Sequence, residues 1–268
     1  MNATTTAELE LFGMYMRATG VPTLSPDSDA PASLRGKTLG IINGGAWITL
    51  WSYFFARRQL PGVRLVNVGN EAVQLNFMRA HHEGRPCPPQ ENIDAFGRYA
   101  RDLVDLCGVD AILISCSTMN RAWPAVRDAV ADSGAPVIAI DEPMMQRAVE
   151  TGGRVLVVAT HGPTVESTRA LLEETAARVG TEIAVCGATV EEAFELLGAG
   201  EIARHNEAIA DAIRGACERE PVDVVVLAQL SMSVFKLSYP DCRAAFGVDV
   251  LTSGEEGFRR ARAVLERV

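Results

Sequence analysis

The sequence has 268 residues, of which 48% are hydrophobic and 22% charged, and its formal net charge is −9. This acidic balance argues against a nucleic acid or an anionic membrane as the main partner. Its apolar runs fall short of the ~20 residues that a membrane-spanning helix needs. The N-terminal residues 1–19 lack the basic start and apolar block of a signal peptide. We therefore expect a cytoplasmic globular protein with a small-molecule partner.

In chain order, a helix is expected over Thr6–Ala18, followed by an irregular stretch rich in Pro, Ser and Asp up to Arg35. Beyond it, short apolar runs alternate with longer amphipathic segments, which predict buried strands and helices respectively. This alternation is typical of an α/β protein with parallel sheets flanked by helices. Strands are expected at Leu39–Ile42, Val63–Val68, Ala111–Ser115, Val137–Ile140, Val155–Ala159, Ile183–Cys186, Val224–Ala228 and Val248–Leu251. Helices are clearest at Ile93–Leu106, Ala122–Ala131, Thr164–Val179 and Ile202–Glu218.

An internal repeat relates the two halves of the chain. Val109–Met119 aligns without a gap to Val222–Met232, which lies 113 residues later. Each segment begins with Val-Asp and four aliphatic residues and ends with a hydroxyl residue and Met. The earlier strand and loop Leu39–Gly45 correspond in the same way to Val155–His161. We therefore expect two pseudo-symmetric α/β domains.

The repeat pairs Cys116 in the first half with Gln229 in the second. Both follow a predicted strand, and ligands of open parallel sheets bind at the carboxyl ends of strands. If the two halves face each other, these loops line opposite walls of an interdomain cleft. We expect the active site in that cleft.

The strand-end loops carry a resemblance to a known family. Cys116-Ser117-Thr118 follows one strand, Asn43-Gly44-Gly45 follows another, and Val158–Thr164 leads through a threonine into a helix. In order and spacing, from about Lys37 to the C-terminus, these segments resemble the aspartate/glutamate/hydantoin racemase superfamily. Many members have a second cysteine where this sequence has Gln229, whose amide cannot exchange a proton near neutral pH.

The resemblance implies cofactor-independent proton transfer at the carbon alpha to a carboxylate of a small acid, with Cys116 as acid–base residue. Two routes remain open because Gln229 replaces the second thiol. In one, His161, Asp141 or Glu142 supplies the second acid or base, and the enzyme is a racemase or another isomerase. In the other, Cys116 works alone as in a decarboxylase or lyase. Arylmalonate decarboxylases also resemble this sequence, but they retain the second-repeat cysteine.

The remaining candidate site residues offer hydroxyl, amide or main-chain donors to a substrate carboxylate. The hydroxyl residues fit helix capping equally well, and the glycines fit tight turns. Two other functions stay open: a non-catalytic two-lobed protein that binds small carboxylates, and a hydrolase or lyase with Cys116 as nucleophile. The expected substrate-binding residues are Asn43, Gly44, Gly45, Ser117, Thr118, Thr160, Thr164, Gln229 and Ser231.

Neither a metal nor an organic cofactor is expected. The six cysteines form no CxxC pair, and the glycine-rich loops lack the GxGxxG spacing of dinucleotide sites. His205 is expected on a solvated helix face. By resemblance, the first lobe is expected to comprise residues 1–142 and 240–268 and to carry Cys116. The second is expected to comprise residues 143–239 and to carry Gln229. A homodimer or higher homo-oligomer is also expected by resemblance.

Overall fold

A computed structural model describes residues 3–19 and 31–268. It divides into two compact units, residues 1–139 with 258–268 and residues 140–257. The expected helix near the N-terminus is confirmed, whereas most of the Pro, Ser and Asp stretch that follows lies outside the described residues. In the part of the chain that is described, no helix is both long and apolar enough to cross a membrane.

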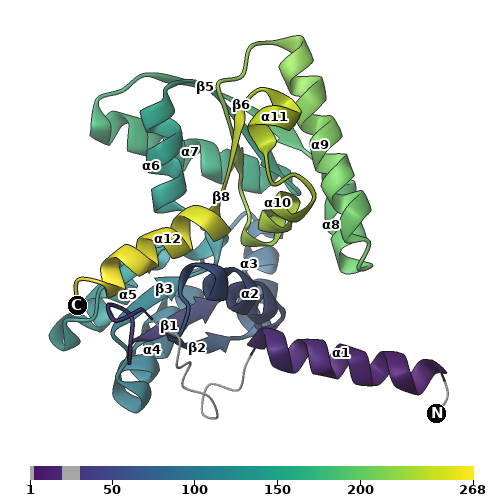
Figure 1. Cartoon of the computed structure of the whole chain (residues 1–268). Helices are drawn as coiled ribbons and strands as arrows, with labels where there is room; N and C mark the ends of the chain where they lie inside the picture. Colours follow the sequence, from purple (N-terminus) through teal and green to yellow (C-terminus); the bar gives the residue numbers. More distant parts are fainter. Residues whose placement is uncertain (1–2, 20–30) are drawn as a thin grey trace. The chain divides into compact units, whose positions relative to one another are not determined.

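The first unit contains a parallel sheet of four strands in the order β2-β1-β3-β4. Figure 1 labels β1, β2 and β3 of this sheet. Phe96 and Leu103 of the long helix α4 and Val126 of α5 pack with Ile112 of the central strand. Burying such a side chain contributes about 1.5–3 kcal/mol. The strands are β1 Thr38–Asn43, β2 Arg64–Gly69, β3 Ala111–Ile114 and β4 Val137–Ala139. The helical segments are α1 Ala3–Thr19, η1 Ala46–Ile48, α2 Thr49–Gln59, α3 Glu71–His82, α4 Gln90–Cys107, η2 Ser117–Ala122, α5 Trp123–Ala129 and η3 Ala131–Ser133.

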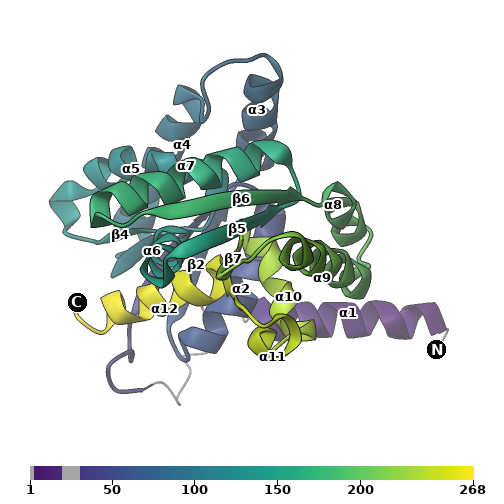
Figure 2. The same cartoon turned by 90° about the horizontal axis from the view of Figure 1, so that it is seen from above.

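The second unit repeats this design with the order β6-β5-β7-β8. Neighbouring residues of β5 point to opposite faces of the sheet: Leu156 packs with Ile213 of α9, and Val157 packs with Leu172 of α7. Figure 2 shows α7 and α9 on opposite sides of the sheet. The strands are β5 Gly153–Ala159, β6 Ile183–Thr189, β7 Val224–Leu227 and β8 Asp249–Thr252. The helical segments are α6 Glu142–Thr151, α7 Gly162–Val179, α8 Glu191–Gly198, α9 Ile202–Arg219, η4 Leu230–Val234, α10 Phe235–Ser238 and α11 Cys242–Phe246. The last helix, α12 Ser253–Leu265, begins in this unit, and its residues from 258 onward belong to the first unit.

All eight predicted strands are present, and the pairing of strands confirms the internal repeat. Leu39 of β1 pairs with Ala111 of β3, and the equivalent Val155 of β5 pairs with Val224 of β7. The two alignments proposed from the sequence therefore hold together in three dimensions. Each half of the repeat builds the central pair of one sheet.

The Val-Asp signature of the repeat has a structural reason. Asp110 accepts a hydrogen bond from the main-chain N–H of Thr38 at 2.7 Å, and Asp223 accepts the same bond from Arg154 at 2.7 Å. Each carboxylate thus fixes the start of the central strand beside it. A Cβ on Gly153 would lie 2.1 Å from Oδ2 of Asp223, and its φ is +73°, so this position favours glycine.

Replacing either aspartate with alanine is expected to lower the free energy of unfolding by about 1–3 kcal/mol, because a charge-assisted hydrogen bond to a strand end is lost. Urea denaturation of Asp110→Ala and Asp223→Ala measures the effect. Asp128→Ala is the matched control, since this exposed carboxylate pairs with the adjacent Arg127, and it should cost less than about 1 kcal/mol. Equal effects of all three substitutions would contradict the strand-fixing role.

The expected domain boundaries are wrong at the C-terminal side. β8 pairs in parallel with β7, from Val224 with Asp249 to Leu227 with Thr252, so it completes the second sheet and does not join the first lobe. The reason is the duplication itself, since β8 occupies the place that β4 has in the first unit. Only residues 258–268 belong to the first unit, where Nη1 of Arg262 donates to the carbonyl oxygen of Gln59 at 3.3 Å.

His205 is fully buried, so its expected place on a solvated face is wrong. Its helix α9 is covered by α8 and α10. Nδ1 lies 2.9 Å from Oδ1 of Asn206, whose own Nδ2 donates to the carbonyl oxygen of Val234 at 3.1 Å. Burial lowers the pKa of the His205 imidazole below its ordinary value of 6.5.

This buried imidazole predicts acid-sensitive stability. The unfolded chain binds a proton at the ordinary pKa of 6.5, whereas the folded chain resists it. The contribution of this group to the free energy of unfolding should therefore be fully present above pH 6.5. It should decrease as the pH falls from 6.5 to the lower pKa of the folded state. The slope due to this group is at most about 1.4 kcal/mol per pH unit. Urea denaturation between pH 7.5 and 5 should show a shallower pH dependence for His205→Gln. An unchanged dependence would contradict the prediction.

Candidate active site

The first unit places the predicted loops together at the carboxyl ends of its central strands. β1 ends at Asn43 and continues into Gly44 and Gly45, and β3 is followed by Ser115 and Cys116. The main-chain N–H of Ser115 donates to the carbonyl oxygen of Ile42 at 3.0 Å, which extends the β1–β3 pairing up to the cysteine.

Asn43 joins the strand ends inside the protein. Its side chain is fully buried, and Oδ1 accepts hydrogen bonds from the hydroxyls of Ser52 at 2.7 Å and Ser115 at 2.5 Å. Its Nδ2 donates to Oδ1 of Asn67 at 2.9 Å. The amide, expected at the substrate, is thus occupied by protein partners. These hydrogen bonds of Asn43 fix the shape of the loop formed by Gly44 and Gly45.

The thiol of Cys116 lies in a small space beside that loop. Cys116 is half-buried and precedes η2, with Sγ 3.2 Å from Oγ1 of Thr118. A Cβ on Gly44 would lie 2.4 Å from Sγ, so a side chain at this position would displace the thiol. The hydroxyl oxygen of the neighbouring Ser117 is buried and has no hydrogen-bond partner among the described residues. A thiol and two hydroxyls therefore share this strand end.

Gln74 is a neighbour of this site that the sequence analysis missed. Its Oε1 lies 3.6 Å from the place where a Cβ on Gly44 would stand, so Gln74 and Cys116 border the same space. The main chain beside it is anchored, because Nδ2 of Asn92 donates to the carbonyl oxygen of Val73 at 3.0 Å.

The helix that carries Gln74 could have been found from its capping signal. Asn70 is the N-cap of α3, and its side chain accepts a hydrogen bond from the N–H of Ala72 at 2.9 Å. Asparagine followed by an acidic residue is a typical start of a helix. The acidic residue, Glu71, also accepts a hydrogen bond from the main-chain N–H of Trp47 at 3.2 Å, which ties α3 to the glycine loop.

The second unit has an equivalent cluster with different chemistry. Gln229 precedes η4 as Cys116 precedes η2, and Thr160 takes the place of Gly44. Oε1 of Gln229 accepts hydrogen bonds from both the main-chain N–H and the hydroxyl of Thr160, each at 2.9 Å. Where the first unit has a thiol beside a glycine, the second unit has an amide bonded to a threonine. The hydroxyl of Thr160 is therefore already bonded within the protein.

The other expected residues of the second unit lie near the starts of its helices. Thr164 is in the first turn of α7, and its main-chain N–H bonds to the carbonyl oxygen of His161 at 3.1 Å. The ring of His161 packs edge-on against Phe194, with centroids 4.8 Å apart. Ser231 is buried in η4.

The two acidic candidates differ in their surroundings. Asp141 is 3% exposed and directly precedes α6. Glu142 begins that helix on the surface, and its carboxylate lies 3.5 Å from Nη2 of Arg178. Of the two, Asp141 alone is buried.

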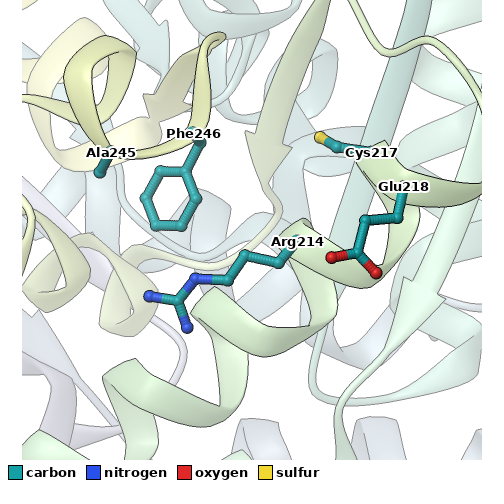
Figure 3. A pocket seen from close by; sticks show the side chains of 5 residues that line it. All are labelled: Arg214, Cys217, Glu218, Ala245 and Phe246. Carbon is teal, nitrogen blue, oxygen red and sulfur yellow. The ribbon is translucent and has the colours of Figure 1, made fainter.

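A separate surface pocket of about 250 Å³ lies in the second unit (Figure 3). It is formed by the last turns of α9 and the end of α11, the helices that precede the starts of β7 and β8. Arg214 in this pocket is held by the carboxylates of Glu207 at 2.9 Å and Asp211 at 2.8 Å. Its charge is thus already paired, and the pocket lies apart from the strand-end loops. Its lining residues are Arg214, Cys217, Glu218, Ala245 and Phe246.

The sequence profile of the Asp/Glu/Hydantoin racemase family matches residues 88–261. The matched region is more than half of the chain and includes both Cys116 and Gln229. The chain belongs to the Asp/Glu/hydantoin racemase family. No curated protein sequence shows a significant match to it.

Solved structures with the same fold include several racemases and a decarboxylase. An aspartate racemase homologue from Pyrococcus horikoshii is 20% identical, with a TM-score of 0.62, over 86% of this chain and all of that one (100%). Allantoin racemase from Klebsiella pneumoniae is 18% identical, with a TM-score of 0.60, over 85% and 87% of the two chains. A variant of arylmalonate decarboxylase is also 18% identical, with a TM-score of 0.60, over 86% and 94%. At these identities the similarity shows the fold, which is the predicted α/β design with two parallel sheets.

Proposed function

We propose that this racemase-family protein catalyses cofactor-independent proton transfer at the carbon alpha to the carboxylate of a small acid, with Cys116 as the acid–base residue. The observation that carries the proposal is the setting of the thiol. Sγ of Cys116 lies at the carboxyl end of a central strand, 3.2 Å from the hydroxyl of Thr118 and against a glycine that leaves room for it. Carboxyl ends of parallel strands are where ligands of such folds bind.

The residues around the thiol suit a carboxylate substrate. The hydroxyls of Ser117 and Thr118 can donate hydrogen bonds to its oxygens, and the main chain of Gly44 and Gly45 can approach it closely. These donors would also stabilise the enolate-like charge that forms when the alpha proton leaves. The free hydroxyl of Ser117 is the best of these donors, because it has no partner among the described residues.

In the second unit, the Thr160–Gln229 cluster offers hydrogen-bonding groups but no acid or base. Oε1 of Gln229 is occupied by Thr160, so any contact with a substrate oxygen falls to the N–H donors of the amide. Because an amide does not exchange protons near neutral pH, a racemase would need His161, Asp141 or Glu142 as its second acid or base. A decarboxylase or lyase would need only Cys116.

The decisive experiment is exchange of the alpha proton in deuterated water, followed by NMR over a panel of enantiopure small carboxylic acids. Exchange without loss of configuration would indicate one acid–base group, and exchange with racemisation would indicate a second. Absence of exchange with every acid that binds would contradict the proposal and favour a carboxylate-binding protein. A covalent adduct on Cys116, seen by mass spectrometry, would instead favour nucleophilic catalysis.

Thiol alkylation provides an independent test of Cys116. Burial raises the pKa of the thiols of Cys186, Cys217 and Cys242, so little reactive thiolate forms there near neutral pH. Iodoacetamide labelling followed by peptide mass spectrometry should modify Cys116 rapidly, and a bound small dicarboxylate should slow that reaction. Slow labelling without protection would argue against a catalytic thiol.

A further inference from the structure

The side chain of Gln74 places an amide beside the thiol of Cys116. It is half-buried on α3, and no hydrogen bond to its side chain is found among the described residues. The three heavy atoms nearest to the position of a Cβ on Gly44 are Sγ and Cβ of Cys116 and Oε1 of Gln74, at 2.4, 3.3 and 3.6 Å. One small molecule can therefore contact both the thiol and the amide.

The separation of the two groups fits the substituent of a small acid. A carbon that exchanges a proton with Sγ lies roughly 3–3.5 Å from it. Sγ and Oε1 are separated by no more than the sum of their distances to the Gly44 position. A group two bonds away from the alpha carbon can then reach hydrogen-bonding distance of Gln74, while the carboxylate is left to the hydroxyls of Ser117 and Thr118.

The charge nearest to Gln74 along α3 is negative. Glu71 precedes it by three residues, so the two side chains are neighbours on the helix, with Cβ atoms about 5–6 Å apart. The carboxylate of Glu71 accepts the main-chain N–H of Trp47, and it has no ion-pair partner in the part of the chain that the structure describes. An anionic group placed at Gln74 would be repelled by Glu71, whereas a neutral group would not.

The start of α3 does little to offset this charge. Two of its free amides are already bonded, because Asn70 accepts the N–H of Ala72 at 2.9 Å and that of Val73 at 3.0 Å. We propose that Gln74 makes the site specific for a small monocarboxylic acid whose beta carbon carries a neutral hydrogen-bonding group, such as a carboxamide. An amide both donates to and accepts from such a group. This inference rests on the proposed function, since it places the alpha carbon at Cys116, and a dicarboxylate still binds there but more weakly.

Binding of succinamate and succinate to the full chain tests this specificity. The two acids differ only in that a carboxamide replaces one carboxylate, and neither reacts with a thiol. Isothermal titration calorimetry gives both dissociation constants, and protection of Cys116 from iodoacetamide shows that the acids bind beside it. Succinamate should bind about three- to tenfold more tightly than succinate. Gln74→Leu removes the hydrogen-bonding groups, so it should weaken succinamate about three- to tenfold and change succinate much less.

Two changes of charge on α3 should alter the preference in a way that a merely structural residue would not. Gln74→Lys places a cation beside the thiol, so this variant should bind succinate more tightly than succinamate. Glu71→Gln removes the repulsion and keeps an acceptor for Trp47, so it should bring the two dissociation constants closer together. Leu75→Lys is the matched control, because it adds the same cation one residue further along α3 on a side chain that is 69% exposed. It should keep the preference for succinamate, since exposed charges are screened.

Equal or weaker binding of succinamate by the unmodified chain would overturn the assignment. So would an unchanged preference in Gln74→Leu or Gln74→Lys, binding that leaves Cys116 unprotected, or the binding of neither acid. Failure of the proposed function is a different result, because it is the absence of alpha-proton exchange with every acid that binds, whichever of the two acids binds more tightly. Far-UV circular dichroism and urea denaturation check that each variant stays folded.

Discussion

Cys116→Ala is expected to lower the rate of alpha-proton exchange by about 10²–10⁴-fold, which is what a single acid–base group typically contributes. Cys116→Ser should be nearly as inactive, because a hydroxyl is a far weaker acid than a thiol. The Michaelis constant should change much less than kcat, since the hydroxyl and main-chain donors of the site remain. Steady-state kinetics on the acid that shows the fastest exchange measures both constants.

Cys107→Ala is the matched control for this substitution. Cys107 is an exposed thiol at the end of α4, outside the strand-end loops, so its removal should leave the rate unchanged. Cys116 packs with the apolar cluster of the first unit, so urea denaturation must show that Cys116→Ala is still folded at the assay temperature. A folded Cys116→Ala protein with full activity would remove Cys116 from the mechanism.

Gly44→Ala is expected to reduce activity about 100-fold although it adds only one methyl group. The new Cβ would lie 2.4 Å from Sγ of Cys116, well inside van der Waals contact, so the thiol must rotate or the loop must shift. A displacement of about 1 Å at a reacting group is enough to lower the reaction rate by about that factor. The same substitution should change the rate at which iodoacetamide alkylates Cys116, which ties the loss to the thiol.

Gly97→Ala is the control for this second prediction. Its Cβ would lie 3.5 Å from that of Ala129, an ordinary contact, and alanine is a better helix former within α4. This variant should keep full activity and the same alkylation rate. If Gly44→Ala also kept both, the thiol would not occupy the space beside the glycine loop, and the proposed geometry of the site would be wrong.

Local signals were sufficient to predict the elements and their repetition. Buried strands and amphipathic helices differ in periodicity over a few residues, so all eight strands could be placed from the sequence. The ungapped match of Val109–Met119 with Val222–Met232 then paired Cys116 with Gln229, and the hydrogen bonds of Asp110 and Asp223 give that match a physical basis. The α/β fold and the strand-end position of the candidate site follow from these two observations.

The tertiary structure decided which side chains are free to act. Asn43 meets Ser115, Thr160 meets Gln229, and Gln74 borders the same space as Cys116 only because strands distant in sequence are adjacent in the sheets. The placement of β8 in the second sheet likewise depends on pairing with β7. Periodicity reports whether a residue is buried, but not which partner takes up its hydrogen-bonding groups. The sequence therefore determined the elements, the duplication and the candidate thiol, and long-range packing alone decided which of the polar groups around that thiol remain free for a substrate.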